Sequence, residues 1–194
     1  MKKVFIYFLV SCVLSITSFG QSTPDEINAF KEQLLLAKND TIRIQMTGML
    51  ANGYRFSNID SSLFYTDQVI ALADKNNLPF IKSSALSLKG ATVLEAGKLP
   101  ESLQFQFEAL EISEKIKDTT NIAFALNGIG NIYMELADYK KANEYYFRSK
   151  DLFEKIGGIG MVYNEISNIG NIYDLMLIPD SGLYYQQIVN VSNI

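Results

Sequence analysis

Acidic side chains are the first candidates for chemistry in this chain, because paired carboxylates can act as general acid and general base. Glu108/Glu111 and Glu135/Asp138 each stand three residues apart, which places each pair on one face of a helix. A solvated helix face explains this spacing more simply than acid–base catalysis does. The 194-residue sequence contains no histidine, which removes the usual base of a serine triad and the commonest metal ligand. The residue types therefore predict a protein that is not an enzyme, with no cofactor and no metal site.

Two glycine-rich runs could suggest a phosphate-binding loop. Such loops follow a strand and open a helix. Gly128–Gly130 lies inside an apolar helical pattern, and Gly157–Gly160 lies between two helices, so neither run fits. The formal net charge is −4, and no basic stripe is present to neutralise phosphates. Nucleic acids and anionic membrane surfaces are therefore not expected as partners.

A near-duplicate segment reveals the organisation of the chain. Ile129–Tyr133 recurs letter for letter as Ile169–Tyr173, 40 residues later, and Gly90 lies one such period before Gly130. A fixed period of this length is typical of stacked helical repeats.

The repeated glycines carry a packing prediction. Glycine inside a helix costs about 1 kcal/mol relative to alanine. Gly90, Gly130 and Gly170 therefore indicate places where the two helices of a repeat touch too closely for a larger side chain. Tyr133 and Tyr173 follow three residues later on the same helix face and are expected to fill the space beside this contact.

Cap and turn residues divide the rest of the chain into helices. Thr23, Pro24 and Glu26 predict a capped lead-in helix over residues 24–39. Asp60 is the expected cap of a later helix. Four helix pairs follow, at about 40–77, 78–117, 118–157 and 158–194. The first is the loosest, with Leu50 where the others have glycine. The predicted fold is all-α, a right-handed superhelical solenoid of antiparallel helix pairs.

The N-terminus predicts export. Lys2 and Lys3 precede an uncharged, mostly apolar run from Val4 to Phe19, and small residues follow, as in a secretory signal peptide over residues 1–20. That run would reach roughly 24 Å as a helix, short of a hydrocarbon core of about 30 Å, so a retained anchor is less favoured. Cys12 offers a second alternative, a lipoprotein, but the chain stays apolar beyond it. We expect an exported chain, periplasmic or secreted.

These residues resemble the tetratricopeptide repeat (TPR) family. Three stretches carry the pattern: Leu126, Ile129, Gly130, Tyr133, Tyr139, Ala142 and Tyr146; Ile166, Ile169, Gly170 and Tyr173; and Leu86, Gly90, Ala109 and Leu110. The third has Val93 where tyrosine is usual, and the consensus proline closing each repeat is absent. The period of about 40 resembles long-repeat variants. The turn Phe56–Ser61, together with a signal peptide, resembles the N-terminal repeats of exported Bacteroidetes-type signalling proteins.

The resemblance implies a binding groove lined by the first helix of each pair. Its groove positions are Asn127, Asn131, Asn164, Asn171, Glu135 and Asp174, and its structural positions are Gly90, Gly130, Tyr133, Ala142, Gly170 and Tyr173. A ladder of asparagine amides, Asn131 and Asn171, offers donors and acceptors to an extended peptide backbone, although asparagine on a solvated face is the simpler interpretation. The charged clamp of some family members is missing, and Arg55 is its sole candidate.

The sequence thus predicts a non-catalytic protein- or peptide-binding TPR module outside the cytoplasm. It could be the sensory part of a signalling system, and the alternative is a structural scaffold of an envelope assembly. No membrane insertion is expected once the signal is removed. The last helix carries Leu183, Tyr184 and Ile188, an apolar content suited to a neighbouring helix on each side. We therefore expect either a fragment of a longer array or self-association through this C-terminal helix.

Overall fold

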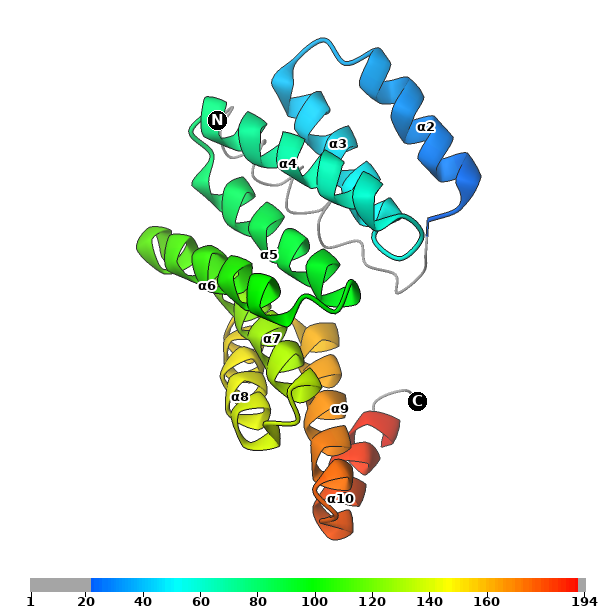
Figure 1. Cartoon of the computed structure of the whole chain (residues 1–194). Coiled ribbons are helices and arrows are strands. Elements are labelled where there is room, and N and C mark those ends of the chain that lie inside the picture. Colours follow the sequence, from blue (N-terminus) through cyan, green and yellow to red (C-terminus); the bar gives the residue numbers. More distant parts are fainter. Residues whose placement is uncertain (1–21, 192–194) are drawn as a thin grey trace. The chain divides into compact units, whose positions relative to one another are not determined.

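The computed structural model describes residues 22–191, and within this range the chain forms nine α-helices and no strand. The predicted all-α fold class is therefore confirmed. The predicted signal peptide and Cys12 fall on residues 1–21, outside the described range. The helices are α2 (Pro24–Leu35), α3 (Asp40–Tyr54), α4 (Ile59–Lys75), α5 (Pro79–Glu95), α6 (Leu99–Ile116), α7 (Thr119–Glu135), α8 (Tyr139–Lys155), α9 (Ile159–Leu175) and α10 (Pro179–Val191) (Figure 1).

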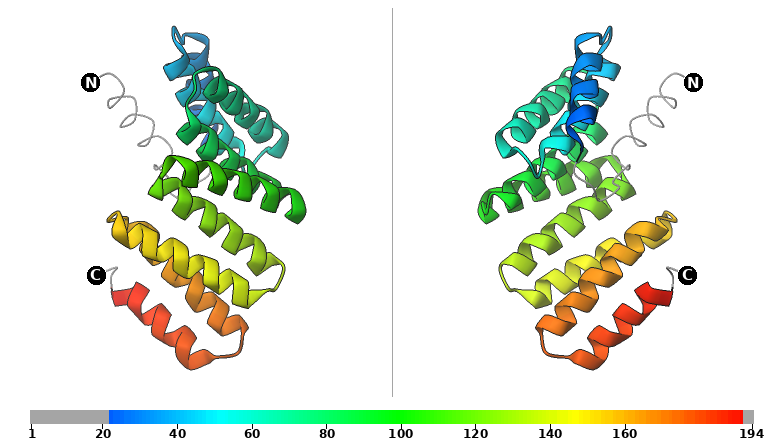
Figure 2. Two further views of the ribbon diagram at one scale, coloured as in Figure 1. Left: turned by 90° about the vertical axis from the view of Figure 1, so that its left-hand side faces the viewer. Right: turned by 90° about the vertical axis from the view of Figure 1, so that its right-hand side faces the viewer.

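The chain divides into two compact units, residues 1–102 and residues 103–194, with the boundary inside α6. In the first unit, α3 packs against both α2 and α4, and α4 packs against α5. In the second unit, α7, α8, α9 and α10 pack in chain order, each against the next (Figure 2). Each helix reverses direction relative to the one before it, because the connections are only a few residues long.

Side-chain caps fix the starts of α2, α3, α4, α7 and α8. Thr23 and Glu26 form the expected capping box, in which the Glu26 backbone N–H donates to Thr23 and the Glu26 carboxylate accepts from the Thr23 N–H. Asn58, rather than Asp60, caps α4, and its Oδ1 accepts from the Ser61 N–H at 2.9 Å. The prediction for Asp60 is wrong because an N-cap needs an extended backbone, which Asn58 adopts while Asp60 lies in the first helical turn.

The lead-in helix is shorter than the predicted 24–39, because α2 ends at Leu35. Asn39 explains this early end. It caps α3 with an extended backbone, φ −148°, and its Oδ1 accepts from the Ile42 N–H. A residue that caps the next helix in this way cannot also continue the previous one.

Helix ends repeat a single motif at intervals of 20 residues. The following residues have a left-handed backbone, with φ between 52° and 72°: Asn77, Gly97, Lys117, Ala137, Gly157 and Leu177. In each case the next residue donates its N–H to a carbonyl five residues back, as Asp138 does to Tyr133 at 2.9 Å. This is the Schellman motif, which satisfies the last carbonyls of a helix. The connection Arg55–Asn58 lacks such a residue, which explains why the first repeat fits the period least well.

Glycine contacts between helices fix the spacing in the second unit. A Cβ placed on Gly130 would come within 2.7 Å of the Tyr146 ring on α8, so only hydrogen fits there. A Cβ on Gly170 would lie 3.3 Å from the Cβ of Tyr185 on α10, a looser contact. Ala142 is fully buried in the same core.

Tyrosine pairs repeat beside these contacts. Tyr133 stacks on Tyr145 with ring centroids 5.6 Å apart, and Tyr173 stacks on Tyr185 at 5.5 Å. In the first unit, the Gly90 carbonyl accepts a 2.7 Å hydrogen bond from the buried Ser102 hydroxyl. In the second unit, the first helix of each pair thus lies against the second through a glycine flanked by stacked tyrosine rings.

Candidate functional site

The residues that the sequence places in a groove lie on two helices of the second unit. Asn127, Asn131 and Glu135 are on α7, and Asn164, Asn171 and Asp174 are on α9. The first two asparagines and Asn164 are half-buried, whereas Asn171, Glu135 and Asp174 are exposed.

The structure joins Asn127 and Asn131 in a chain of hydrogen bonds. The Asn131 amide donates to Asn127 Oδ1 at 3.3 Å, and the Asn127 amide donates to Glu165 Oε1 at 2.8 Å. From the other side, the Tyr146 hydroxyl donates to Asn131 Oδ1 at 2.7 Å, and the Ser149 hydroxyl donates to Glu165 Oε1 at 2.8 Å. This chain links α7, α8 and α9 and holds both asparagine side chains in place.

Glu165 anchors the chain from a buried position. Its side chain is 1% exposed, and Oε2 has no hydrogen-bond partner among the described residues. Burial raises the pKa of Glu165 to about 7, although the hydrogen bonds from Ser149 and Asn127 favour the charged form. Burial also raises the pKa of Tyr146, so its hydroxyl stays protonated and acts as a donor.

Sequence reasoning missed Glu165, although the repeat period contained a signal. The residues one and two periods earlier are Ala125 and Ala85, and both are buried. The earlier repeats have a buried alanine at this position. A carboxylate in its place must therefore either reach solvent or find hydrogen-bond partners in the core. Ser149 and Asn127 provide those partners.

The other predicted positions are less connected. Asn171 makes no side-chain hydrogen bond to a described residue, so its amide is available at the surface. The Asn164 amide contacts the sulfur of Met161 at 3.9 Å. Asp174 is engaged by α10, since its Oδ2 accepts from the Gln186 amide and its carboxylate lies against Gly182. Asp174 therefore fastens two helices together as well as facing solvent.

Arg55, the single candidate for a charged clamp, is already paired. Its guanidinium lies 3.3 Å from the Glu95 carboxylate and stacks over the Phe56 ring at 4.6 Å. A ligand carboxylate would have to displace Glu95 to use this charge.

Over residues 22–191, acidic, cysteine and histidine side chains form no group of three that could hold a metal ion. None of the described helices is long and apolar enough to cross a membrane.

Known proteins resemble this chain in sequence and in fold. The chloroplast protein FLUORESCENT IN BLUE LIGHT of Arabidopsis thaliana is 30% identical over 138 residues, which cover 69% of this chain and 40% of that protein. A Rap protein crystallised in complex with competence and sporulation factor superposes with a TM-score of 0.77 at 18% identity, over 84% of this chain and 46% of that one.

A third structure is a signal-transduction ATPase with numerous domains from Pyrococcus horikoshii, which carries a tetratricopeptide repeat sensor. It superposes with a TM-score of 0.67 at 19% identity, over 84% of this chain and 25% of that one. The chain thus spans less than half the length of each of these three proteins.

A match to a family model identifies the family of this chain more specifically than these similarities to single proteins do. The model of the SusR N-terminal TPR domain matches residues 16–156, well over half of the chain. TPR-type helical repeats are typically modules of protein interaction. The chain therefore belongs to the family of SusR N-terminal TPR domains.

Proposed function

We propose that this protein is a non-catalytic module that binds an extended protein or peptide segment across α7 and α9, outside the cytoplasm. The observation that carries the proposal is the fixed pair of half-buried amides, Asn127 and Asn131. The exposed amide of Asn171 extends this polar face along α9.

An inventory of hydrogen bonds explains why these amides suit a peptide backbone. An asparagine side chain has two N–H donors and an oxygen with two lone pairs. Asn131 uses one donor on Asn127 and one lone pair on Tyr146. Asn127 uses one donor on Glu165 and one lone pair on Asn131. Each amide therefore retains one donor and one acceptor for a ligand, which is the pair that a peptide unit complements.

The fixed geometry of the two amides favours affinity. Side chains that are ordered before binding lose less conformational entropy when a ligand arrives. The Rap protein that this fold resembles was crystallised with competence and sporulation factor, which supports a binding role for the same helical framework.

The sensory part of a signalling system is the biological role that we propose. Membership of the SusR N-terminal TPR family and the fold shared with a tetratricopeptide repeat sensor support this role. Export is proposed from Lys2, Lys3 and the apolar run that follows them. Mass spectrometry of the protein from its native cells tests export, because a chain that retains Met1 or carries a lipid on Cys12 contradicts it.

Peptide selection followed by variant binding tests the proposed face. A random peptide library is selected on the purified protein, and the best peptide is titrated by calorimetry. Asn171→Ala should weaken binding at least tenfold, because it removes a solvent-facing amide without disturbing the buried hydrogen bonds. Gln104→Ala is the matched control, since Gln104 is an exposed amide on α6. Equal affinity of the two variants would place the binding surface elsewhere.

A structural scaffold is the second candidate, and exposed apolar residues favour it. Leu177 is 87% exposed, Leu183 is 55% exposed and Tyr184 is 59% exposed. Apolar surface of this kind marks an interaction site or an aggregation liability. Self-association through α10 would cover Leu183 and Tyr184 and would build an assembly without a regulated ligand.

A further inference from the structure

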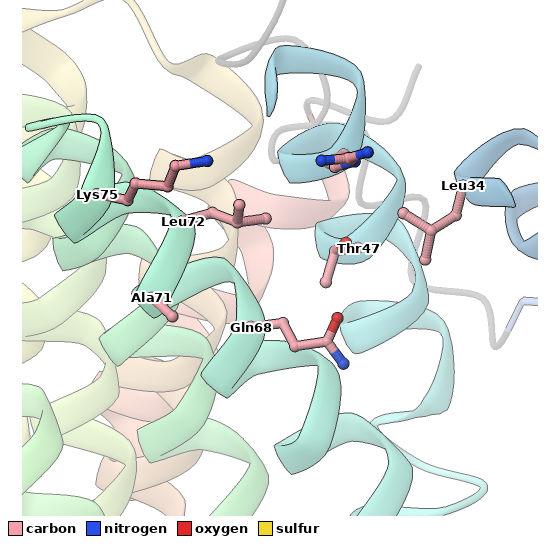
Figure 3. A pocket seen from close by; sticks show the side chains of 7 residues that line it. Leu34, Thr47, Gln68, Ala71, Leu72 and Lys75 are labelled. Atoms are coloured by element: carbon pink, nitrogen blue, oxygen red, sulfur yellow. The ribbon is translucent and has the colours of Figure 1, made fainter. Parts of the chain in front are cut away.

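A pocket of about 320 Å³ lies in the first unit, on helices that the proposed peptide-binding face does not use. Figure 3 shows α4 on one side, with Gln68, Ala71, Leu72 and Lys75, and Leu34 of α2 on the other. Thr47 of α3 lies between them, and Arg43 of α3 completes the lining. Three apolar side chains, Leu34, Ala71 and Leu72, and four polar or charged ones line the pocket. Small-molecule sites commonly combine apolar walls with a few polar groups.

Thr47 contributes a buried polar atom without a partner. The residue is 1% exposed, and its hydroxyl makes no hydrogen bond with a described residue. Threonine hydroxyls in helices usually bond to the carbonyl four residues back. Thr66 does so to Ser62 at 2.7 Å, and Thr92 does so to Leu88 at 2.9 Å, in the same unit. Of these three threonines, Thr47 alone lacks this hydrogen bond, and Thr47 alone lines the pocket.

Two cations stand at one end of the pocket. Lys75 Nζ lies 2.8 Å from Asp40 Oδ2, and an Arg43 guanidinium nitrogen lies 3.6 Å from Asp40 Oδ1. The two cations share a single carboxylate, so this end keeps an excess of one positive charge. Both side chains are largely exposed, at 66% for Lys75 and 51% for Arg43, and can turn toward an anion that enters.

The other lining residues determine which groups a ligand can carry besides an anion. Gln68 is two turns away from Lys75 along α4, and its amide makes no hydrogen bond to a described residue. Leu34 and Leu72 line the pocket from α2 and α4, which lie on opposite sides of α3 (Figure 3). The pocket therefore offers a cationic end, an apolar middle and a neutral polar end.

We propose that this pocket is a second binding site, which takes a small apolar carboxylate. The carboxylate would lie at Arg43 and Lys75, its apolar group against Leu34 and Leu72, and any amide group of the ligand against Gln68. The C-terminal leucine of a peptide and a free branched-chain acid share this chemistry. The site is independent of the face on α7 and α9, so either proposal can fail while the other holds.

Titrations with three probes separate the possible ligands. N-acetylglycyl-leucine carries the carboxylate, the apolar group and an amide; 4-methylpentanoate lacks the amide; and N-acetylglycyl-leucinamide lacks the charge. Calorimetry with the intact protein should show that the first binds best and that the amidated probe binds at least tenfold more weakly than the first. Similar affinity for the first two probes would identify free acids as the ligand class, whereas a clear preference for the first would identify peptide C-termini.

Three variants locate the site. Lys75→Met should weaken the binding of N-acetylglycyl-leucine at least fivefold, and Lys115→Met, which breaks an exposed ion pair on α6, is the matched control and should not. Thr47→Val should raise the Tm of the free protein, because it removes a buried hydroxyl that has no partner. Absence of binding at millimolar probe, or equal effects of Lys75→Met and Lys115→Met, would overturn the proposal.

Discussion

The side-chain amide of Asn127 donates a 2.8 Å hydrogen bond to the buried carboxylate of Glu165 and so ties α7 to α9. Ser149 on α8 donates to the same oxygen, which brings three helices to one charged group. No cation among the described residues pairs with this carboxylate, and burial raises its pKa to about 7. The hydrogen bonds that hold Asn127 and Asn131 therefore depend on a carboxyl group whose charge changes near neutral pH.

Glu165→Gln should change how stability depends on pH. An unfolded glutamate ionises near pH 4.5, whereas folded Glu165 holds its proton up to about pH 7. Between these values the folded state binds more protons than the unfolded state, so the free energy of unfolding falls as pH rises. Each pKa unit is worth about 1.4 kcal/mol, so the total loss is about 3 kcal/mol.

Denaturant unfolding at a series of pH values measures this effect. Glu165→Gln should be more stable than the wild type by about 1–3 kcal/mol at pH 8 and nearly equal to it at pH 4.5. The exposed residue Glu144 supplies the control, Glu144→Gln, whose profile should follow the wild type. Parallel profiles for the wild type and Glu165→Gln would show that Glu165 titrates normally.

The glycine contacts predict a graded series of alanine variants. Gly130→Ala should destabilise by about 1–3 kcal/mol, because the new Cβ meets the Tyr146 ring at 2.7 Å. Gly170→Ala should be nearly neutral, since a 3.3 Å contact offsets the gain in helix propensity. Gly48→Ala meets no atom within 4 Å and should stabilise by up to about 1 kcal/mol. Denaturant midpoints decide, and a Gly130→Ala protein as stable as Gly48→Ala would refute the close contact.

The helix-end motif predicts opposite effects of glycine and alanine. Ala137 has φ +56° and Gly97 has φ +71°, both in the left-handed region that glycine occupies without strain. Ala137→Gly should therefore stabilise the protein by up to about 1 kcal/mol, and Gly97→Ala should destabilise it by about 1 kcal/mol. Thermal unfolding measures both, and a lower Tm for Ala137→Gly would contradict the assignment.

Self-association predicts a concentration-dependent mass. Light scattering should show the wild type growing beyond a monomer as its concentration rises, because Leu183 is 55% exposed on α10. Leu183→Glu should shift the protein toward the monomer. Leu35→Glu is the control, since Leu35 is also exposed but lies on α2 of the other unit. A wild type that stays monomeric at every concentration would remove this proposal.

Local features of this protein could be predicted from the sequence because their causes lie within a few residues. The capping box of Thr23 and Glu26 and the turns around Gly97 and Gly157 depend on neighbours in the chain. The period of the glycines predicted the helix pairs for a similar reason, since each repeat needs the same small residue at the same register. Asp60 failed as a cap because two polar residues, Asn58 and Asp60, could both begin that helix.

Tertiary structure decided which polar side chains are available to a ligand. Asn127 and Asn131 were expected on α7, but their link to Glu165 depends on how closely α9 approaches. Arg55 forms an ion pair only because the fold brings Glu95, 40 residues later in the chain, next to its guanidinium. Thr47 lacks a partner only because the packing of α2, α3 and α4 leaves a space beside it. Burial and pairing depend on side chains that are distant in sequence, so a repeat pattern fixes where a residue lies on its helix, while the neighbouring helices determine its charge, its partners and its access to solvent.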